Sequence, residues 1–160
     1  MVVVSTSLSL DFRPHGDFVG QTREFVHDLY RRLLVDHDEA DRIALTTHEL
    51  LENLVKYADD GPSSVEIRLQ RQEGQDYVGI ETRNSTTPER ISELRDLLDR
   101  IVDSEDPIAL YDDLIASSIE RPGSGLGLAR IRAEADMKLA YSIEGNEVTI
   151  RAEAPVSTRE

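Results

Sequence analysis

The sequence predicts an α+β fold, a two-layer sandwich in which helices cover one face of a mixed, mostly antiparallel sheet. Three observations lead to this prediction. Segments with apolar residues at every second position alternate with segments in which they recur every three or four positions. Two pairs of strand-like segments are joined by short polar turns, as in antiparallel hairpins. A length of 160 residues suits one core, so we expect a single domain over residues 1–160.

The N-terminal half should contain one strand, two helices and a hairpin. The predicted elements are a strand at 8–12, a helix at 18–33, a helix from 39 to about 60, and strands at 65–69 and 77–82. Asp17 and Asp38 precede the two helical patterns and are predicted to be their N-caps. Gly61-Pro62 ends the second helix, and a polar turn that contains Gly74 joins the two strands.

The C-terminal half should contain three helices and a second hairpin. The predicted elements are helices at 88–101 and 108–115, a helix from Leu126 to about Leu139, and strands at 140–143 and 148–152. Pro88 suits the first turn of a helix, and Asp106-Pro107 precedes the next one. Gly145-Asn146 is a typical hairpin turn. The whole order is therefore β-α-α-β-β-α-α-α-β-β, with the helices on one side of the sheet.

The charge balance restricts the partners that the protein can bind. Thirty-two acidic and eighteen basic residues give a net charge of −14, which repels nucleic acid. The acidity serves either solubility or the attraction of a basic partner protein. The absence of cysteine excludes disulfides and thiolate metal sites. No apolar run is long enough to cross a membrane and no basic leader is present, so we expect a cytoplasmic protein.

The first candidate site lies in the helical segment THELLENLVKYA. A step of about 100° per residue places Glu49, Asn53 and Lys56 on one narrow stripe, with Glu52 at its edge. A carboxylate one turn from a carboxamide oxygen can support a Mg²⁺ shell and accept a nearby proton. The alternative is that the stripe is only the solvated side of an amphipathic helix.

The second candidate site is the segment GSGLGLARI, in which three glycines precede a helix. Gly123, Gly125 and Gly127 leave the approach to the helix N-terminus without side chains. Unpaired amide hydrogens and the positive end of the helix dipole favour a phosphate there. The alternative is a flexible loop entering a helix that must pack closely on the sheet.

The histidines provide weaker signals. His37 lies among acidic residues, a pattern that a helix start explains without a metal ion. His15, His27 and His48 have no matching partners in the sequence. We expect structural or surface roles for all four.

Together, the E-x-x-x-N helix in ELLENLVKYA and the later GSGLGLARI resemble the N box and the glycine-rich box of the GHKL, or Bergerat-fold, ATPases. The short form without a phosphoacceptor histidine hairpin resembles the anti-sigma-factor type serine/threonine kinases. A closer likeness is to the SiaB-type kinases, through VGIETRNS, LRDLLDRI, ALYDDLI and GSGLGL. The resemblance extends over residues 36–152.

The resemblance implies ATP and Mg²⁺ as cofactors. Glu49 would be the general base, Asn53 would bind the Mg²⁺, and Lys56 would face the phosphates. The phosphate-binding segment would comprise Gly123, Gly125, Leu126, Gly127 and Leu128. Residues 101–124 would form a lid over the nucleotide.

One motif departs from the family pattern. The superfamily carries D-x-G-x-G after its third strand, where the aspartate binds the adenine amino group. The counterpart in this sequence is Asn84, in N-S-T-T-P, with no glycine. An asparagine oxygen can accept the same hydrogen bond without the charge that strengthens it. Asn84 is equally explained as a turn residue at the end of a strand.

The resemblance leaves three functional hypotheses. The first is a protein serine/threonine kinase of a partner-switching pathway, which phosphorylates a STAS-type antagonist protein, forms a homodimer and binds a sigma factor or another regulatory protein. The second is a non-catalytic binding module that sequesters such a partner. The missing D-x-G-x-G motif supports this hypothesis. The third is an ATPase with water as the acceptor.

Overall fold

The computed structural model describes residues 5–118 and 125–159. The element order matches the predicted one. The strands are β1 (Thr6–Phe12), β2 (Ser63–Gln72), β3 (Gln75–Ser85), β4 (Lys138–Glu144) and β5 (Glu147–Val156). The helices are α1 (Gly16–Leu33), α2 (His37–Tyr57), α3 (Pro88–Val102), α4 (Pro107–Ser118) and α5 (Leu126–Ala133). Within the described residues, none of these helices combines the length and the apolar character needed to span a membrane.

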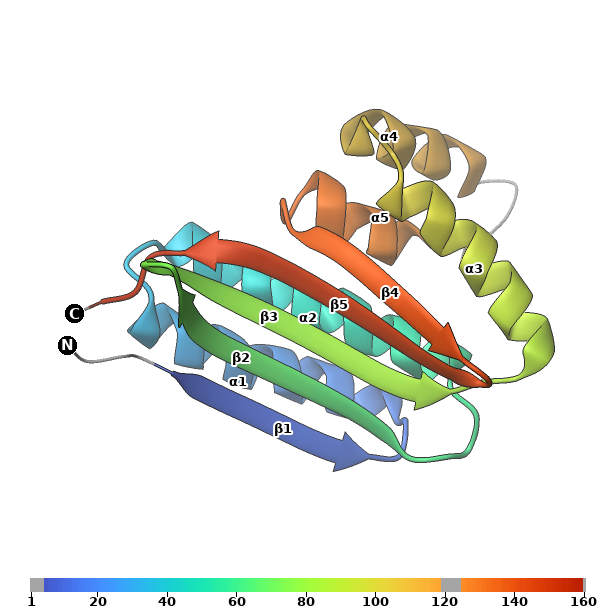
Figure 1. Cartoon of the computed structure of the whole chain (residues 1–160), viewed down its shortest axis with the longest axis horizontal. Coiled ribbons are helices and arrows are strands. Elements are labelled where there is room, and N and C mark those ends of the chain that lie inside the picture. The colour runs from blue at the N-terminus through green and yellow to red at the C-terminus, as the bar shows by residue number, and fades with distance from the viewer. Residues whose placement is uncertain (1–4, 119–124, 160) are drawn as a thin grey trace.

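The strands form one five-stranded sheet in the order β1-β2-β3-β5-β4 (Figure 1). All four pairings are antiparallel, so the parallel pairing expected in a mixed sheet does not occur among the described strands. Glu73 and Gly74 both have positive φ, as a two-residue hairpin turn between β2 and β3 requires. The fold is a two-layer α/β sandwich, as predicted.

The core lies between the sheet and the helix layer. Alternate residues of β2 and β3 are buried on the side that α1 and α2 cover, and Figure 1 shows both helices behind the sheet. Leu50 and Leu54 of α2 and Ile67 and Ile80 of the sheet are almost fully buried. Burial of such side chains is the main source of stability. It also fixes which side of α2 faces away from the core.

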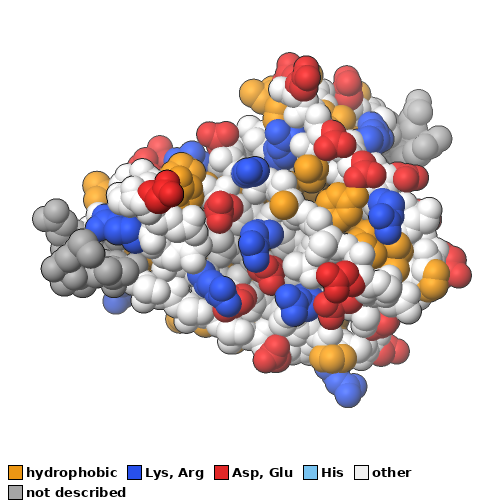
Figure 2. All heavy atoms as spheres, in the orientation of Figure 1, with side chains coloured by type: hydrophobic (Ala, Val, Ile, Leu, Met, Phe, Trp, Pro, Cys, Tyr) orange, Lys and Arg blue, Asp and Glu red, His pale blue; other side chains and the backbone are white. Residues whose placement is uncertain are grey.

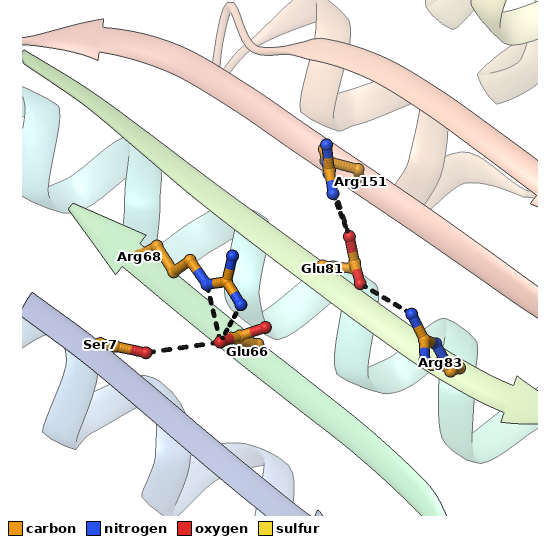
Figure 3. A network of polar contacts seen from close by, with 6 residues as sticks. All are labelled: Ser7, Glu66, Arg68, Glu81, Arg83 and Arg151. Carbon is orange, nitrogen blue, oxygen red and sulfur yellow. Dashed lines mark hydrogen bonds and ion pairs between the residues drawn. The ribbon is translucent and has the colours of Figure 1, made fainter. Parts of the chain in front are cut away.

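The opposite face of the sheet carries a network of paired charges (Figure 3). Arg68 Nε donates to Glu66 Oε1 at 2.7 Å, and Arg151 Nε donates to Glu81 Oε2 at 3.0 Å. Figure 2 shows acidic and basic side chains intermixed over this face. An antiparallel sheet with one solvated face has this alternation, so the network accounts for the polar half of each strand.

Two predicted helix caps are wrong by two residues. His15, not Asp17, caps α1, and its Nδ1 accepts from the backbone N–H of Asp17 at 3.3 Å. Asp36, not Asp38, caps α2, and its Oδ1 accepts from the backbone N–H of Asp38 at 2.8 Å. Each predicted cap is instead an acidic residue of the first helical turn, where it complements the helix dipole.

The helix predicted to extend to about Leu139 ends at Ala133. Asp136 has a positive φ of 51°, which turns the chain, and β4 begins at Lys138. Leu139 pairs with Ala152 of β5 and faces the core. A short apolar run fits a helix or a buried strand equally well by periodicity, and pairing with β5 decides for the strand.

Two arginines connect α3 to its neighbouring helices α2 and α5. Arg132 of α5 donates to backbone carbonyls of Val102 and Ser104, at 3.2 and 2.9 Å, at the end of α3. Arg90 of α3 lies 3.4 Å from each of the last carbonyls of α2, those of Lys56, Tyr57 and Ala58. These contacts fix α2 and α5 relative to a common neighbour.

Candidate functional site

The candidate site begins with the outward side of α2. Glu49 and Asn53 are partly exposed and Lys56 is exposed, while Leu50 and Leu54 are buried on the other side of the helix. The Lys56 ammonium lies 5.0 Å from the centre of the Tyr57 ring. The predicted stripe therefore exists, and its members point away from the core.

The first turn of α5 lies opposite this stripe across a cleft of about 190 Å³. The cleft is lined by Glu49, Glu52, Asn53, Lys56, Tyr57, Gly125, Leu126, Gly127 and Leu128. The two segments that the sequence singled out thus meet in space, and α2 and α5 are in direct contact. Oxygen-bearing side chains form one wall of the cleft, and the N-terminus of a helix forms the other.

Gly125 and Gly127, at the start of α5, exclude a side chain for different structural reasons. Gly125, the N-cap of α5, has a left-handed φ of 73°, and a Cβ there would overlap the Leu97 side chain. A Cβ on Gly127 would instead overlap the Glu49 carboxylate. The first glycine is required by the backbone and by packing against α3. The second allows Glu49 to lie against the start of α5.

Sequence reasoning missed Arg130, which pairs with Glu49. Arg130 Nη1 lies 3.2 Å from Glu49 Oε1, and Arg130 Nε lies 2.6 Å from Glu134 Oε2. The hydrogen bond to Glu134 and, to a lesser extent, that to Glu49 raise the pKa of the Arg130 guanidinium. One sequence signal could have found Arg130. It follows Gly127 by three residues, and this spacing places both residues on the same face of the helix.

Asn84 does not line the cleft. It is buried in β3, on the helix side of the sheet, and its Nδ2 donates to the Ser85 carbonyl at 3.2 Å. This position agrees with a residue that ends a strand. Gly123 lies outside the described residues.

The predicted lid, 101–124, contains a helix where the structure describes it. Ile101 belongs to α3 and is buried, and α4, whose Leu114 is buried, packs against α5. Burial raises the pKa of the Tyr111 phenol of α4, and the Glu134 charge raises it further. This part of the segment is therefore docked beside α5.

The other polar groups of the chain have different partners. His27 Nε2 lies 2.6 Å from Asp41 Oδ1, and His37 Nδ1 lies 3.1 Å from Arg31 Nη2. His48 lines a separate cleft between α1 and α2. The described residues contain no group of three or more histidine, aspartate or glutamate side chains arranged to hold a metal. A pocket of about 420 Å³ on the open sheet face is larger than the candidate cleft, but most of its charged side chains are already paired with one another.

Comparison with known proteins agrees with this geometry. The model of the histidine kinase-like ATPase domain family matches residues 13–152. Among solved structures, the chain is similar to one from the SiaB-SiaC complex of Pseudomonas aeruginosa, with a TM-score of 0.63 and 12% identity. That match covers 93% of this chain and 89% of the other, and at this identity it shows the fold alone. No curated protein matches the sequence. Because the family match spans most of the chain, including both walls of the cleft, the chain belongs to the histidine kinase-like ATPase domain family.

Proposed function

We propose that the protein is an ATP- and Mg²⁺-dependent protein serine/threonine kinase of the partner-switching type. The observation that carries this proposal is the meeting of Glu49 and Asn53 with the glycine-rich start of α5 across one cleft. The family supplies the expectation of a nucleotide. The cleft supplies a carboxylate, a carboxamide and free amide hydrogens within one small space.

Glu49 is the proposed general base. Its side chain is 13% exposed, so it is largely shielded from water yet open to the cleft. It would accept the proton of an attacking hydroxyl group, a role that contributes about 10²- to 10⁴-fold to rate in enzymes. In the kinase, that hydroxyl belongs to a serine or threonine of the acceptor protein.

The remaining residues fit the phosphate end of a nucleotide. ATP would supply the transferable phosphoryl group, and Mg²⁺ would offset the charge of the phosphates. Asn53 would hold the Mg²⁺ through its side-chain oxygen, and Lys56 would face the phosphates. Mg²⁺ sites of this kind use few protein ligands and complete their shell with phosphates and water, which suits a cleft without a dedicated acidic cluster.

The missing Cβ of Gly127 provides a structural test of this fit. A side chain there would overlap the Glu49 carboxylate at the N-terminus of α5. The amides of Gly125, Leu126, Gly127 and Leu128 belong to the cap and first turn of that helix, and such amides lack helical partners and favour anions. The residues present therefore fit a bound phosphate.

The proposed acceptor is a small regulatory protein of the STAS type. The similar solved structure is a complex of two proteins, SiaB and SiaC, which supports a protein partner for this fold. The net charge of −14 would favour a partner with a basic contact surface. Homodimerisation and the binding of a sigma factor remain part of the proposal.

Calorimetric titration with ATP and Mg²⁺ tests nucleotide binding, and γ-labelled ATP tests transfer. The kinase should release heat at submillimolar ATP and move the label to the serine or threonine of a purified STAS-type protein. Glu49→Gln should bind ATP but transfer the label at least about 100 times more slowly. No heat at millimolar ATP would overturn the proposal, and label released only as phosphate would indicate an ATPase with water as acceptor.

A non-catalytic binding module is the second candidate. The position of Asn84 favours it, because Asn84 is buried outside the cleft and donates its amide to a neighbouring carbonyl. A protein of this kind would bind its partner with the same affinity in the presence and absence of ATP. A kinase would release or modify the partner when ATP and Mg²⁺ are added.

A further inference from the structure

The two oxygens of the Glu49 carboxylate have different surroundings. Oε1 accepts a hydrogen bond from Arg130 Nη1 at 3.2 Å. Oε2 is the oxygen nearest to the missing Cβ of Gly127, on the glycine-rich side of the cleft. A charge-assisted hydrogen bond favours one orientation of the carboxylate, and with Oε1 on Arg130 it is Oε2 that lies beside Gly127.

Arg130 is itself held in place. Its Nε donates at 2.6 Å to Oε2 of Glu134, the C-cap residue of α5. Glu134 is in turn close enough to Tyr111 of α4 for its charge to raise the pKa of that phenol. The guanidinium therefore bridges two carboxylates with different nitrogen atoms, an arrangement that a point-charge lysine does not reproduce.

We propose that Arg130 is a positioning residue, which orients Glu49 by holding Oε1 so that Oε2 lies beside Gly127, at the start of α5. This inference rests on the proposed function, since it assigns Arg130 a role in proton transfer through Glu49. Arg130 lies outside the residues that line the cleft, and it borders the separate cleft of about 590 Å³ between α1 and α2. Its effect on turnover would therefore be exerted through Glu49, without a contact to the nucleotide.

If the ion pair between α2 and α5 only stabilised the fold, removal of Arg130 would lower the stability and leave the rate of turnover unchanged. The Arg130 side chain is 40% exposed and the Glu134 side chain 42%, so solvent screens that pair and it adds little to stability. The Glu49 side chain is 13% exposed, so thermal unfolding of the Arg130 variants has to be measured beside their rates. Removal of Arg130 should then leave the fold and ATP binding intact. If orientation is its role, the rate of turnover falls while folding and binding do not change.

The experiment measures the loss of γ-labelled phosphate from ATP with Mg²⁺, whether the acceptor is protein or water. Arg130→Ala should lower kcat at least 10-fold with less than a twofold change in the Kd for ATP. Arg130→Lys should restore only part of the rate. Arg100→Ala, which removes an exposed arginine of α3, is the charge-matched control and should match the unmodified chain.

A double variant separates action through Glu49 from an independent effect. In the Glu49→Gln background, Arg130→Ala should change the rate by less than twofold, because no base remains to be oriented. Free guanidinium, at concentrations well below those that unfold the chain, should raise the rate of Arg130→Ala and not that of Glu49→Gln. The wide cleft beside Arg130 offers it access.

The outcomes distinguish this inference from the proposed function. Equal rates for Arg130→Ala and the unmodified chain overturn the inference alone, as do additive effects in the double variant. A loss of ATP binding in both Arg130→Ala and Arg130→Lys, with unchanged thermal unfolding, also overturns it, because Arg130 would then bind the nucleotide. An unmodified chain that neither binds nor consumes ATP overturns the proposed function, and this inference with it.

Discussion

Gly127 is the residue that brings the two walls of the cleft together. Its backbone is helical, so alanine should be tolerated there, and alanine in a helix is up to about 1 kcal/mol more favourable than glycine. The added Cβ would nevertheless overlap the Glu49 carboxylate and push it aside. We therefore predict that Gly127→Ala keeps or slightly raises the melting temperature while lowering ATP turnover at least about 10-fold. Thermal unfolding and labelled-ATP assays of one preparation measure both.

Gly125→Ala is the matched control for this prediction. Gly125 has positive φ and is packed against Leu97, so alanine there should lower the melting temperature. If Gly127→Ala also unfolded at a lower temperature, its glycine would be explained by packing alone. Full turnover by Gly127→Ala would show that the position of Glu49 is unimportant.

Asn53 provides the second prediction at the residue scale. If its side-chain oxygen holds Mg²⁺, Asn53→Ala should weaken ATP binding about 10-fold or more in the presence of Mg²⁺ and leave binding in EDTA unchanged. Calorimetric titrations under the two conditions give the comparison. Equal affinities of Asn53→Ala and the unmodified chain with Mg²⁺ would remove Asn53 from the proposed metal site.

The sequence predicted the residues of α2 that point into the cleft because helical spacing alone determines them. It could not predict Arg130 as the partner of Glu49. That contact depends on how closely α5 approaches α2, which packing against α3 and the sheet decides. It could not place Asn84 either, because the side to which a residue points depends on the register of β3 with its neighbours.

At the scale of elements, α2 ends beside the cleft and Arg90 of α3 covers that end. The guanidinium interacts with the last three carbonyls, at 3.4 Å each, and with the negative end of the helix dipole. Arg90→Ala should reduce the free energy of unfolding by about 0.5–1 kcal/mol. Urea unfolding of this variant beside Arg100→Ala measures the difference. A loss no greater than that of Arg100→Ala would mean that the three contacts are not stabilising.

The order and type of all ten elements followed from periodicity and from turn residues, but several ends did not. The predicted caps of α1 and α2 were wrong because each helix start offers two residues that could serve, His15 or Asp17 and Asp36 or Asp38. Only the backbone geometry selects His15 and Asp36. The predicted end of α5 was wrong because the apolar residues Met137 and Leu139 fit a helix as well as a strand. Hairpin pairing, a long-range interaction, resolved that ambiguity.

At the scale of the whole molecule, the residues that stabilise the fold and those that line the candidate site lie in different places. One face of the sheet is solvated and most of its charged side chains are paired, while the other face supports α1 and α2 over an apolar core (Figures 1 and 2). α2 therefore serves both layers, since one side belongs to the core and the other carries Glu49 and Asn53. Substitutions on the first side should act on folding, and those on the second side on turnover.

Tyr30 of α1 lies in this core and makes the stability of the protein depend on pH. Its side chain is 2% exposed, and burial raises the pKa of its phenol from 10.0 to about 12, although a hydrogen bond with the Thr6 side chain opposes this. Between these values the unfolded chain loses the proton and the folded chain keeps it. The contribution of Tyr30 to stability is thus complete below pH 10 and is lost as the pH rises towards 12, by about 3 kcal/mol in total.

Tyr30→Phe removes this titration and keeps the ring in the core. At pH 7 the variant should be equally stable or up to about 1 kcal/mol less stable, since it loses the hydrogen bond with Thr6. Above pH 10 the unmodified chain should lose stability faster than Tyr30→Phe, so that by pH 11 its unfolding free energy falls below that of the variant. Urea unfolding at pH 7, 9, 10 and 11 gives both curves. Parallel curves up to pH 11 would mean that the Tyr30 phenol ionises as readily in the folded chain as in the unfolded one, and that its surroundings are wetter than the packing of α1 on the sheet requires.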